Sequence, residues 1–408
     1  MSQQEAKHHL WVLVTLSLIA TAGIALPYPV LAPLFAGEVS PLTRFAGLDP
    51  KLLLGLVLAI YPLGVLVGSA VLGALSDQWG RRTLLLWTLA GALAGYGLTA
   101  LAIGWESYPL FALGRLLTGF CEGNIAIARA ATAELHPQIP RHRAFARLNA
   151  AGYGGWLLGP VIGGQAAFLG AEAVFLIAAL AVALALVLVW LVLPRDQASG
   201  GKKPLLALLR QDNSLVLLKD GRIRAFFAMY LLLTLGVNAH YEFTPLYLYE
   251  SFGFDEAAIS YVTLAETVMM VTASLWLLNR LQGRFGITSV TAAGMLALGL
   301  LVAMLALAPP LWLVLFSYPL CGLAIACYNG GLPVFASEGF GEEGQGKVMG
   351  LMVTTFCLGN VLMALAGSVL ALWGALWALV AGGLLCLLAW LSFLALGQAG
   401  PVAATKRA

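Results

Sequence analysis

Long apolar stretches follow one another along this chain, separated by short polar loops. A membrane-spanning helix needs roughly 20 mostly apolar residues, each of which advances it by about 1.5 Å. Applied to 408 residues, this length predicts twelve spans. Their expected ranges are 10–36, 52–76, 83–104, 106–133, 146–168, 172–193, 224–249, 257–279, 287–308, 311–336, 347–372 and 375–397. The first stretch is too long for a cleaved signal peptide, so we count it as a span.

The loops divide these spans into two sets of six. Most connections are so short that neighbouring helices must be antiparallel, but a long polar stretch follows Pro194. The sequence therefore predicts an all-α membrane protein with an N-terminal six-helix half (1–194), a cytoplasmic linker (195–222), a C-terminal six-helix half (223–397) and a cytoplasmic tail (398–408).

The basic residues give an orientation, because short cytoplasmic loops collect Lys and Arg. If the N-terminus is cytoplasmic, only Arg44 and Lys51 fall outside, and only Arg115 and Arg129 fall within a span. Every other Lys and Arg lies in loops or helix ends on the cytoplasmic side. We expect both termini to be cytoplasmic.

Composition restricts the class of protein further. Hydrophobic residues make up 61% of the chain and charged residues 10%, against roughly 45–50% and about 25% in soluble proteins. A soluble enzyme, a disordered chain and a coiled coil are excluded. A net charge of +3, with no basic run interleaved with aromatics, predicts no nucleic-acid partner. The five cysteines lack the spacing of metal ligands or disulfides, so we expect neither a metal site nor a cofactor.

Short echoes indicate that the two halves repeat one another. Asp77-Gln78-Trp79-Gly80-Arg81 follows the second span, and Gly283-Arg284-Phe285-Gly286-Ile287 follows the eighth. Tyr-Pro-Leu occurs at 108–110 in the fourth span and at 318–320 in the tenth. Repeated six-helix halves are typical of transporters that bind substrate near the membrane midplane.

Three motifs in this chain match sequences that are shared within one family of membrane proteins. Residues 73–82 match the loop G-x-x-x-D-R-x-G-R-R, with Gln78 where the family has Arg. Arg115 and Gly119 match an R-x-x-x-G segment in the fourth span, and residues 155–164 match G-x-x-x-G-P-x-x-G-G in the fifth. The chain thereby resembles the major facilitator superfamily, and in particular its twelve-span drug:proton antiporters, whose antiporter element is the third motif. The resemblance covers nearly the whole chain and implies the major facilitator fold.

The loop motif implies a cytoplasmic gate. Asp77 would face the N-terminus of the eleventh span, where a carboxylate is stabilised, and Arg81 would pair with Glu134 at the end of the fourth. The alternative is that these charges only set topology. The complete gate set is Gly73, Asp77, Gly80, Arg81, Arg82 and Glu134.

The antiporter element consists of Gly155, Gly159, Pro160, Gly163 and Gly164. Glycines at every fourth position make a flat helix face, and Pro160 removes one helical hydrogen bond. The resemblance implies a close contact between the fifth and eighth spans that seals one side of a cavity. Generic close packing explains the glycines equally well.

Ionisable groups inside a membrane are costly, so those present are functional candidates. They occur in three spans: Arg115, Glu122 and Arg129 in the fourth, His240 and Glu242 in the seventh, and Glu266 in the eighth. The resemblance places the first, fourth, seventh and tenth spans around a central cavity. Drug:proton antiporters often carry an acid in the first span, and this chain has none between Leu10 and Phe35.

The charges of the fourth span recur every seven residues and should share one helix face. They could conduct protons, bind an anion, or form a static network. Glu122 and Glu266 are the first candidates for the proton carrier, followed by Glu242, His240 and Arg115. A lone His in a membrane helix is also commonly a structural residue.

The substrate-cavity candidates combine aromatic, amide and charged side chains: Tyr28, Arg115, Glu122, Asn238, Tyr241, Tyr328 and Asn329. Such a lining favours an amphipathic substrate. The chain has no nucleotide-binding loop or catalytic motif, so we expect no enzymatic activity.

The sequence thus predicts a secondary active transporter that exports an amphipathic small molecule or drug in exchange for protons by alternating access. Proton-coupled or facilitated uptake of a small metabolite or organic anion is the alternative. Its expected partners are the substrate, protons and the lipid bilayer, and we expect a monomer in a bacterial inner membrane.

Overall fold

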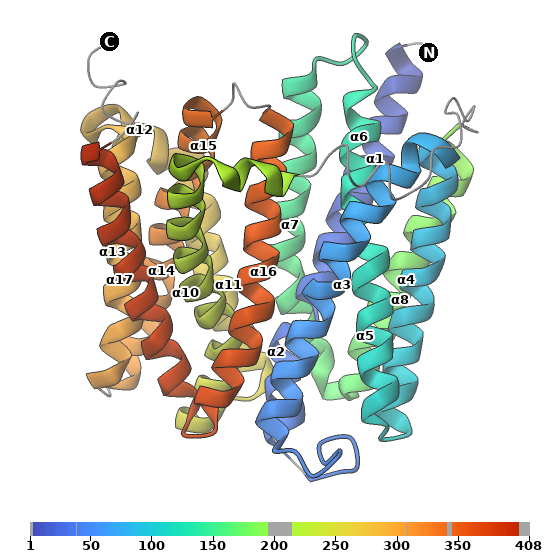
Figure 1. Ribbon diagram of the computed structural model, residues 1–408. Coiled ribbons are helices and arrows are strands. Elements are labelled where there is room, and N and C mark those ends of the chain that lie inside the picture. The colour runs from blue at the N-terminus through green and yellow to red at the C-terminus, as the bar shows by residue number, and fades with distance from the viewer. Residues whose placement is uncertain (1–2, 38, 195–213, 308, 341–344, 400–408) are drawn as a thin grey trace. The chain divides into compact units, whose positions relative to one another are not determined.

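The computed structural model describes residues 3–37, 39–194, 214–307, 309–340 and 345–399. Within them, the side chains of residues 73, 74, 77, 141, 142, 146, 214, 345, 346 and 397–399 are not described. All regular secondary structure in these ranges is helical (Figure 1).

The first six spans form as predicted, two of them in two pieces. They are α1 (Gln3–Ala25) with α2 (Tyr28–Ala36), α3 (Pro50–Trp79), α4 (Arg81–Gly104), α5 (Tyr108–Glu122) with α6 (Ile125–Ala133), α7 (Arg141–Ala166) with the turn η1 (Ala167–Leu169), and α8 (Ala171–Val192).

The second six follow the short turn η2 (Ser214–Lys219). They are α10 (Gly221–Phe252), α11 (Glu256–Thr272) continued by the wide turn η3 (Ala273–Leu277) into α12 (Leu278–Phe285), α13 (Ile287–Ala303) with η4 (Met304–Leu307), α14 (Leu311–Asn329) with α15 (Leu332–Phe340), α16 (Gln345–Ala371) and α17 (Ala375–Ala399).

Among the described residues, eleven of these segments are long and apolar enough to cross a membrane. The twelfth, α7, has 26 residues. Its hydropathy is lower because it begins with a basic stretch, 141–147, and contains the glycines of the antiporter element. The prediction of an all-α membrane protein with twelve helices is confirmed.

Several helices extend beyond the apolar windows from which they were predicted. α3 begins at Pro50, where the Asp49 carboxylate accepts a hydrogen bond of 2.8 Å from the Lys51 amide. α10 begins at Gly221, where Asp220 accepts one of 2.7 Å from the Arg222 amide. Hydropathy locates only the part of a helix inside the hydrocarbon, whereas capping side chains determine where the helix begins.

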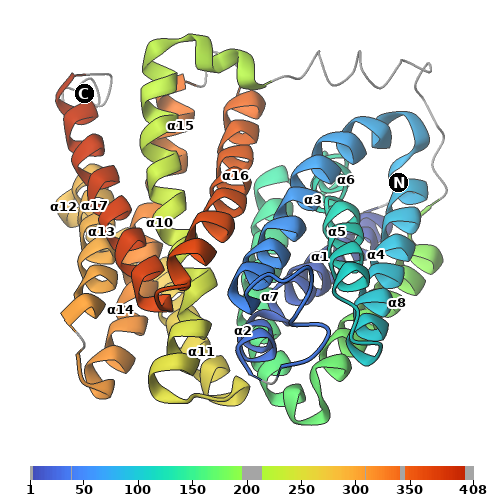
Figure 2. The same cartoon turned by 60° about the horizontal axis from the view of Figure 1, so that its bottom comes forward.

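The chain forms two compact units, Met1–Gln211 with Asp255–Ser260, and Asp212–Phe254 with Tyr261–Ala408. The same pairs of spans pack within each. In the first unit α1 packs on α7 and α8, and α4 on α5 and α8; in the second α10 packs on α16 and α17, and α13 on α14 and α17 (Figure 2). Most of the predicted linker, residues 195–213, lies outside the described residues.

Glycine turns at equivalent places support the repeat. Gly80 joins α3 to α4 with φ 90° and ψ 146°, and Gly286 joins α12 to α13 with φ 81° and ψ 150°. L-residues other than Gly rarely adopt this conformation. Gly170 before α8 and Gly374 before α17 also have positive φ, which makes a second equivalent pair.

The repeated Tyr-Pro-Leu tripeptide, by contrast, does not occupy equivalent positions along its two helices. Tyr108 begins α5, whereas Tyr318 lies two turns inside α14. Both spans nevertheless break near their middle, at residues 123–124 and 330–331. The equivalence therefore belongs to the breaks rather than to the tripeptide.

Most glycines of the antiporter element in α7 pack against α1. A Cβ at Gly155 would lie 2.7 Å from the Ala22 amide nitrogen, and one at Gly159 would lie 2.7 Å from the Ala22 carbonyl oxygen. A Cβ at Gly163 would overlap the Leu26 carbonyl oxygen. Only Gly164 faces the start of α11, where a Cβ would lie 2.6 Å from the Glu256 carbonyl oxygen, within the first unit.

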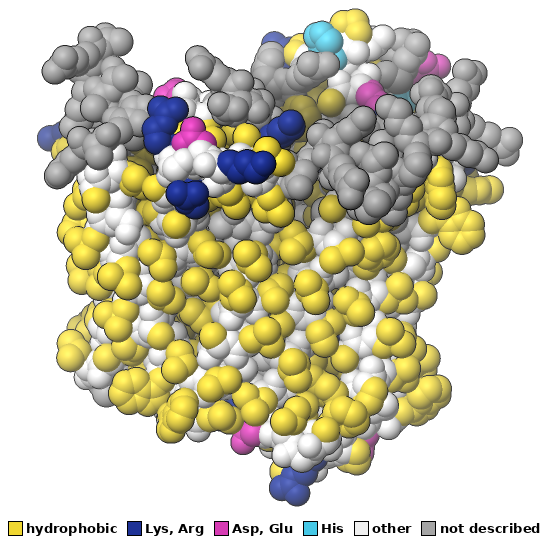
Figure 3. Space-filling model, viewed as in Figure 1, with side chains coloured by type: hydrophobic (Ala, Val, Ile, Leu, Met, Phe, Trp, Pro, Cys, Tyr) yellow, Lys and Arg dark blue, Asp and Glu magenta, His cyan; other side chains and the backbone are white. Residues whose placement is uncertain are grey.

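Figure 3 shows how the surface matches a bilayer. Hydrophobic side chains cover the middle of the face shown, and the charged side chains that are visible lie towards the ends of the helices. This is the distribution expected of an integral membrane protein.

A Gly163→Ala substitution should destabilise the protein, because the added methyl group has no space against the α1 backbone. We expect a loss of about 1–3 kcal/mol, seen as a lower midpoint of thermal unfolding in detergent. Gly97→Ala is the matched control, since nothing lies within 4 Å of a Cβ there. Equal midpoints for the two variants would contradict the close α1–α7 contact.

Candidate functional site

A buried carboxylate, Glu122, lies at the centre of the first unit. It is the last residue of α5, and its side chain is 2% exposed. Tyr96 of α4 donates a hydrogen bond of 2.6 Å to its Oε1, and Tyr61 of α3 donates one to its Oε2. Both oxygens of the carboxyl group are therefore held by tyrosine hydroxyls from two neighbouring spans.

Arg115, two turns before Glu122 on α5, completes this cluster. Its guanidinium carbon lies 4.3 Å from the centre of the Tyr61 ring and 6.0 Å from that of Phe175 on α8. The side chain is 4% exposed, and its Nε and Nη1 atoms have no hydrogen-bond partner among the described residues. Tyr61 therefore connects two charges that are too far apart along the helix to pair directly.

Glu122 also reaches the first span, where the sequence has no acid. A Cβ placed on Gly23 of α1 would lie 3.5 Å from the Glu122 Oε1 and 2.8 Å from the Tyr96 hydroxyl. A carboxyl group is thus present beside the first span, but it is carried by the fourth. A methyl group at residue 23 would crowd the Tyr96 hydroxyl, whereas it would only touch the Glu122 carboxyl group at van der Waals distance.

Arg115, Glu122 and Arg129 do not lie on one unbroken helix. The fourth span breaks at Gly123 and Asn124, and α6 starts at Ile125. The side chain of Arg129 is exposed, whereas the other two are buried. The break lies at a close contact where residue 123 must be a glycine, because a Cβ there would lie 2.5 Å from the carbonyl carbon of Gly68 on α3.

The second unit contains a buried histidine–carboxyl pair. The Nε2 atom of His240 on α10 lies 2.9 Å from Oε1 of Glu266 on α11. The hydroxyl of Thr244 lies 3.3 Å from Nδ1, and the ring stacks on Tyr318 of α14 with centroids 5.6 Å apart. If Nε2 carries the proton, it donates to Glu266 while Nδ1 accepts from Thr244. His240 is therefore a bonded member of a cluster and not an isolated residue.

Two further polar groups of α10 are buried without complete pairing. The amide of Asn238 accepts a hydrogen bond of 3.2 Å from Asn360 of α16, which leaves its Nδ2 without a partner among the described residues. Glu242, one turn later, is 3% exposed, and neither of its oxygens has a partner in that part of the chain. One donor and two acceptors therefore lie one turn apart on the same helix.

The ion pair expected in the gate set is present. Arg81 at the start of α4 donates a hydrogen bond of 3.0 Å from Nε to Oε1 of Glu134, and its Nη1 contacts the Ser76 hydroxyl. Arg82 donates to the Trp190 carbonyl oxygen at 2.7 Å, at the end of α8. The side chains of Gly73 and Asp77 lie outside the described residues.

The aromatic candidates are divided between buried and exposed positions. Tyr28 packs edge-on against Trp156 of α7 with centroids 6.0 Å apart. Tyr328 is buried, whereas Asn329 is exposed and Tyr241 is half-buried. The sequence did not identify Tyr61, Tyr96 and Tyr318 as candidates. A tyrosine in an apolar span is interpreted as a packing residue unless the structure shows an ionisable group beside it.

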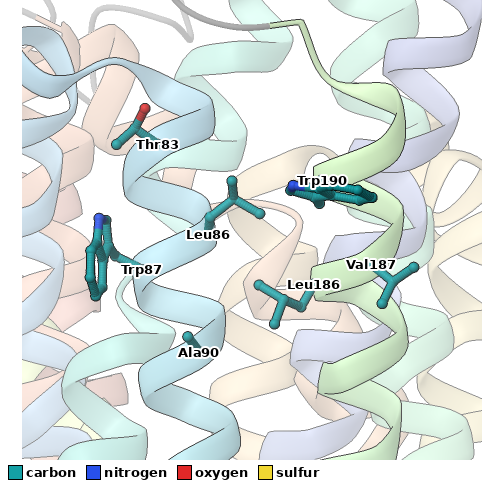
Figure 4. Close-up of a pocket in the computed structure, with 7 residues that line it drawn as sticks. All are labelled: Thr83, Leu86, Trp87, Ala90, Leu186, Val187 and Trp190. Carbon is teal, nitrogen blue, oxygen red and sulfur yellow. The ribbon is translucent and has the colours of Figure 1, made fainter.

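A groove between α4 and α8 offers no comparable chemistry. Leu86, Trp87, Ala90, Leu186, Val187 and Trp190 line it, with Thr83 near one end (Figure 4). The two tryptophans are mostly exposed. An apolar groove on the outer face of two membrane-spanning helices suits hydrocarbon chains better than a polar substrate, so the candidate site is the buried clusters.

Comparisons with known proteins agree with this architecture. A sequence profile described as Major Facilitator Superfamily matches residues 13–364. The class G tetracycline resistance protein of Vibrio anguillarum is 28% identical over 381 residues, which cover 90% of this chain and 92% of that protein.

Solved structures share the fold. A crystal structure of the nucleoside transporter NupG superposes with a TM-score of 0.77 at 15% identity, covering 95% of this chain and 99% of the other. The human organic anion transporter MFSD10 gives a TM-score of 0.66 at 20% identity, covering 95% and 99%.

Replacing Tyr96 by Phe should destabilise the first unit, because one oxygen of the buried Glu122 would lose its donor. A buried polar group left unsatisfied costs about 1–3 kcal/mol, which thermal unfolding in detergent would detect. Tyr153→Phe is the control, since Tyr153 is 50% exposed. A Tyr96→Phe protein as stable as the control would show that the 2.6 Å contact contributes little.

Proposed function

Because the chain belongs to the major facilitator superfamily, it is a transporter and not an enzyme, and we propose that it exports an amphipathic drug in exchange for protons. The likeness to a tetracycline resistance protein over nine-tenths of both chains supports efflux. Tetracycline, a multi-ring amphipathic compound, is therefore the first substrate to test. Alternating access would move the two six-helix halves around a midplane site.

Glu122 is the proposed proton carrier of the first unit, and its enclosure carries the proposal. A carboxyl group surrounded by α1, α3, α4 and α5 can bind or release a proton only when a path to water opens. Arg115 keeps a permanent charge two turns away. Loss of the proton leaves a carboxylate that accepts both tyrosine hydrogen bonds, whereas a proton on one oxygen requires the tyrosine at that oxygen to reorient.

Substrate contacts are proposed for α10 and for the aromatic and amide candidates. Asn238 Nδ2 and the Glu242 oxygens would hydrogen-bond a ligand that carries both acceptor and donor groups, as the hydroxyls and amide of tetracycline do. Tyr28, Tyr241, Tyr328 and Asn329 would contact its rings. Arg115 and Glu122 are enclosed among helices of the first unit, which favours a role in coupling over direct contact with a large substrate.

Arg81 and Glu134 would stabilise the state that is closed at the cytoplasmic end, together with Asp77, Gly73 and Gly80. The protein would act as a monomer in a bacterial inner membrane with both termini in the cytoplasm, as the distribution of Lys and Arg predicts. The antiporter element, with its glycines packed on α1, would keep this half rigid while the halves move.

The Glu122→Gln variant should lose proton-driven export while keeping exchange of external for internal drug, because only the ionisable group is removed. We expect at least a tenfold lower initial rate of tetracycline accumulation into inside-out vesicles energised by a pH gradient. Glu106→Gln, an exposed carboxyl of the same unit, is the control and should remain active.

The direction of this result decides between the rival functions. Export that persists in Glu122→Gln would remove this residue from coupling. Tetracycline flux that no pH gradient drives in the wild type would remove drug:proton exchange altogether, and accumulation of an organic anion on the opposite side would favour uptake.

The Arg81–Glu134 pair should matter for transport and not for folding. The two side chains are 18% and 57% exposed, so their pairing contributes only about 0.2–1 kcal/mol. Arg81→Glu and Glu134→Arg should each reduce export severalfold in cells that carry equal amounts of protein. The double exchange should restore more than half of it. Full export by both single variants would leave these charges with a role in topology alone.

A further inference from the structure

Two helix crossings, one in each unit, place ionisable side chains in equivalent positions. Gly119 of α5 packs against the carbonyl oxygen of Tyr61 on α3, and Gly322 of α14 packs against the carbonyl oxygen of Glu266 on α11. α5 and α3 are the fourth and second spans of their half, as are α14 and α11 of theirs. Tyr61 and Glu266 are therefore counterparts in the internal repeat.

The residue one turn before each glycine is also equivalent. Arg115 precedes Gly119 by four residues, and Tyr318 precedes Gly322 by four. Arg115 lies over the ring of Tyr61, which bonds Glu122. Tyr318 stacks on His240, which bonds Glu266. Each crossing thus gathers the same three groups: a base, a tyrosine ring stacked on it, and a carboxyl group.

The two clusters differ in what can titrate. In the first, arginine remains charged, so only the carboxyl group exchanges a proton. In the second, the imidazole and the carboxyl group are bonded at 2.9 Å, so a proton can be shared between them. The other titratable side chains that interact with this pair or with its neighbours, on α10, α14 and α17, are phenols and thiols that are neutral at neutral pH: Tyr241, Tyr247, Tyr318, Cys321, Tyr328 and Cys386.

We propose that the His240–Glu266 pair is a second proton-coupling site, so that the protein exchanges two protons for each substrate molecule, one through each half. The pair takes up one proton from the outer side and releases it to the cytoplasm, as Glu122 does in its own half. This inference rests on the proposed function. It goes beyond that function because a single carrier would suffice for drug:proton exchange.

The number of protons per tetracycline tests the proposal directly. Purified full-length protein in liposomes is given fixed pH and tetracycline gradients, and the membrane potential is varied until net tetracycline flux stops. With the charge of tetracycline known at each pH, that potential gives the ratio. We expect two protons for the wild type and one for Glu266→Gln. Glu338→Gln, an exposed carboxyl of the second unit, should keep two.

A wild-type ratio of one that Glu266→Gln leaves unchanged would overturn the second site while leaving proton-coupled export intact. A wild type without any proton-driven flux would instead overturn the proposed function, so the two failures are distinguishable.

A second measurement does not require transport. Proton release on tetracycline binding, followed with a pH indicator in weakly buffered detergent solution, should fall by about half in Glu266→Gln. Wild-type release in that variant, with tetracycline still bound, would also overturn the proposal. His240→Gln should shift the pH at which release is half-maximal, and an unshifted profile would exclude the histidine from the pair.

Discussion

The close crossing of α3 and α5 determines where the buried charge of the first unit can lie. Gly119 and Gly123 on α5 and Gly64 and Gly68 on α3 bring the two backbones together with no space for a Cβ between them. Tyr61 is consequently fixed within reach of both Arg115 and Glu122. In a membrane interior, where water cannot complete the hydrogen bonds of an isolated carboxyl group, this contact makes a glutamate tolerable.

The same crossing lies beside the break in the fourth span. α5 ends at Glu122, and the next residue, Gly123, packs against the α3 backbone. The glutamate thus lies at the end of one helical segment, and two residues separate it from the start of the next. A change in its hydrogen bonds therefore acts at a point where the backbone is already interrupted.

Sequence was sufficient for the elements of this fold and for the chemistry of its candidate residues. The twelve spans follow from hydropathy, and the ionisable groups are few enough to be found by inspection. It could not reveal which of them meet. Glu122 depends on tyrosines from α3 and α4, and His240 depends on Glu266 and Tyr318. These partners are distant in sequence, and no periodicity marks a tyrosine whose hydroxyl binds a charge.

Predictions from residue spacing were also less reliable where they assumed an unbroken helix. The fourth-span charges do recur every seven residues, but the helix is interrupted at residues 123–124, between Glu122 and Arg129. Likewise the Tyr-Pro-Leu echo suggested matching heights that α5 and α14 do not have. Gly80 and Gly286 indicate the internal repeat more reliably than the tripeptide does. Both turns have a positive φ, which favours glycine, whereas no backbone conformation requires Tyr-Pro-Leu.

Gly23 offers a physical explanation for the absence of an acid from the first span. The absence of a side chain there leaves space for the Tyr96 hydroxyl, which bonds the Glu122 carboxyl group beside α1. The carboxyl group of Glu122 on α5 lies beside α1, as an acid carried by α1 would. It also accepts hydrogen bonds from two tyrosines. An acid in the fourth span instead of the first therefore keeps an ionisable group beside α1. It changes the helix that carries the acid and whose position responds to its charge. That helix is α5, which crosses α3 at the glycines and ends where the span is broken, so the proposed proton carrier and the break of the fourth span are adjacent.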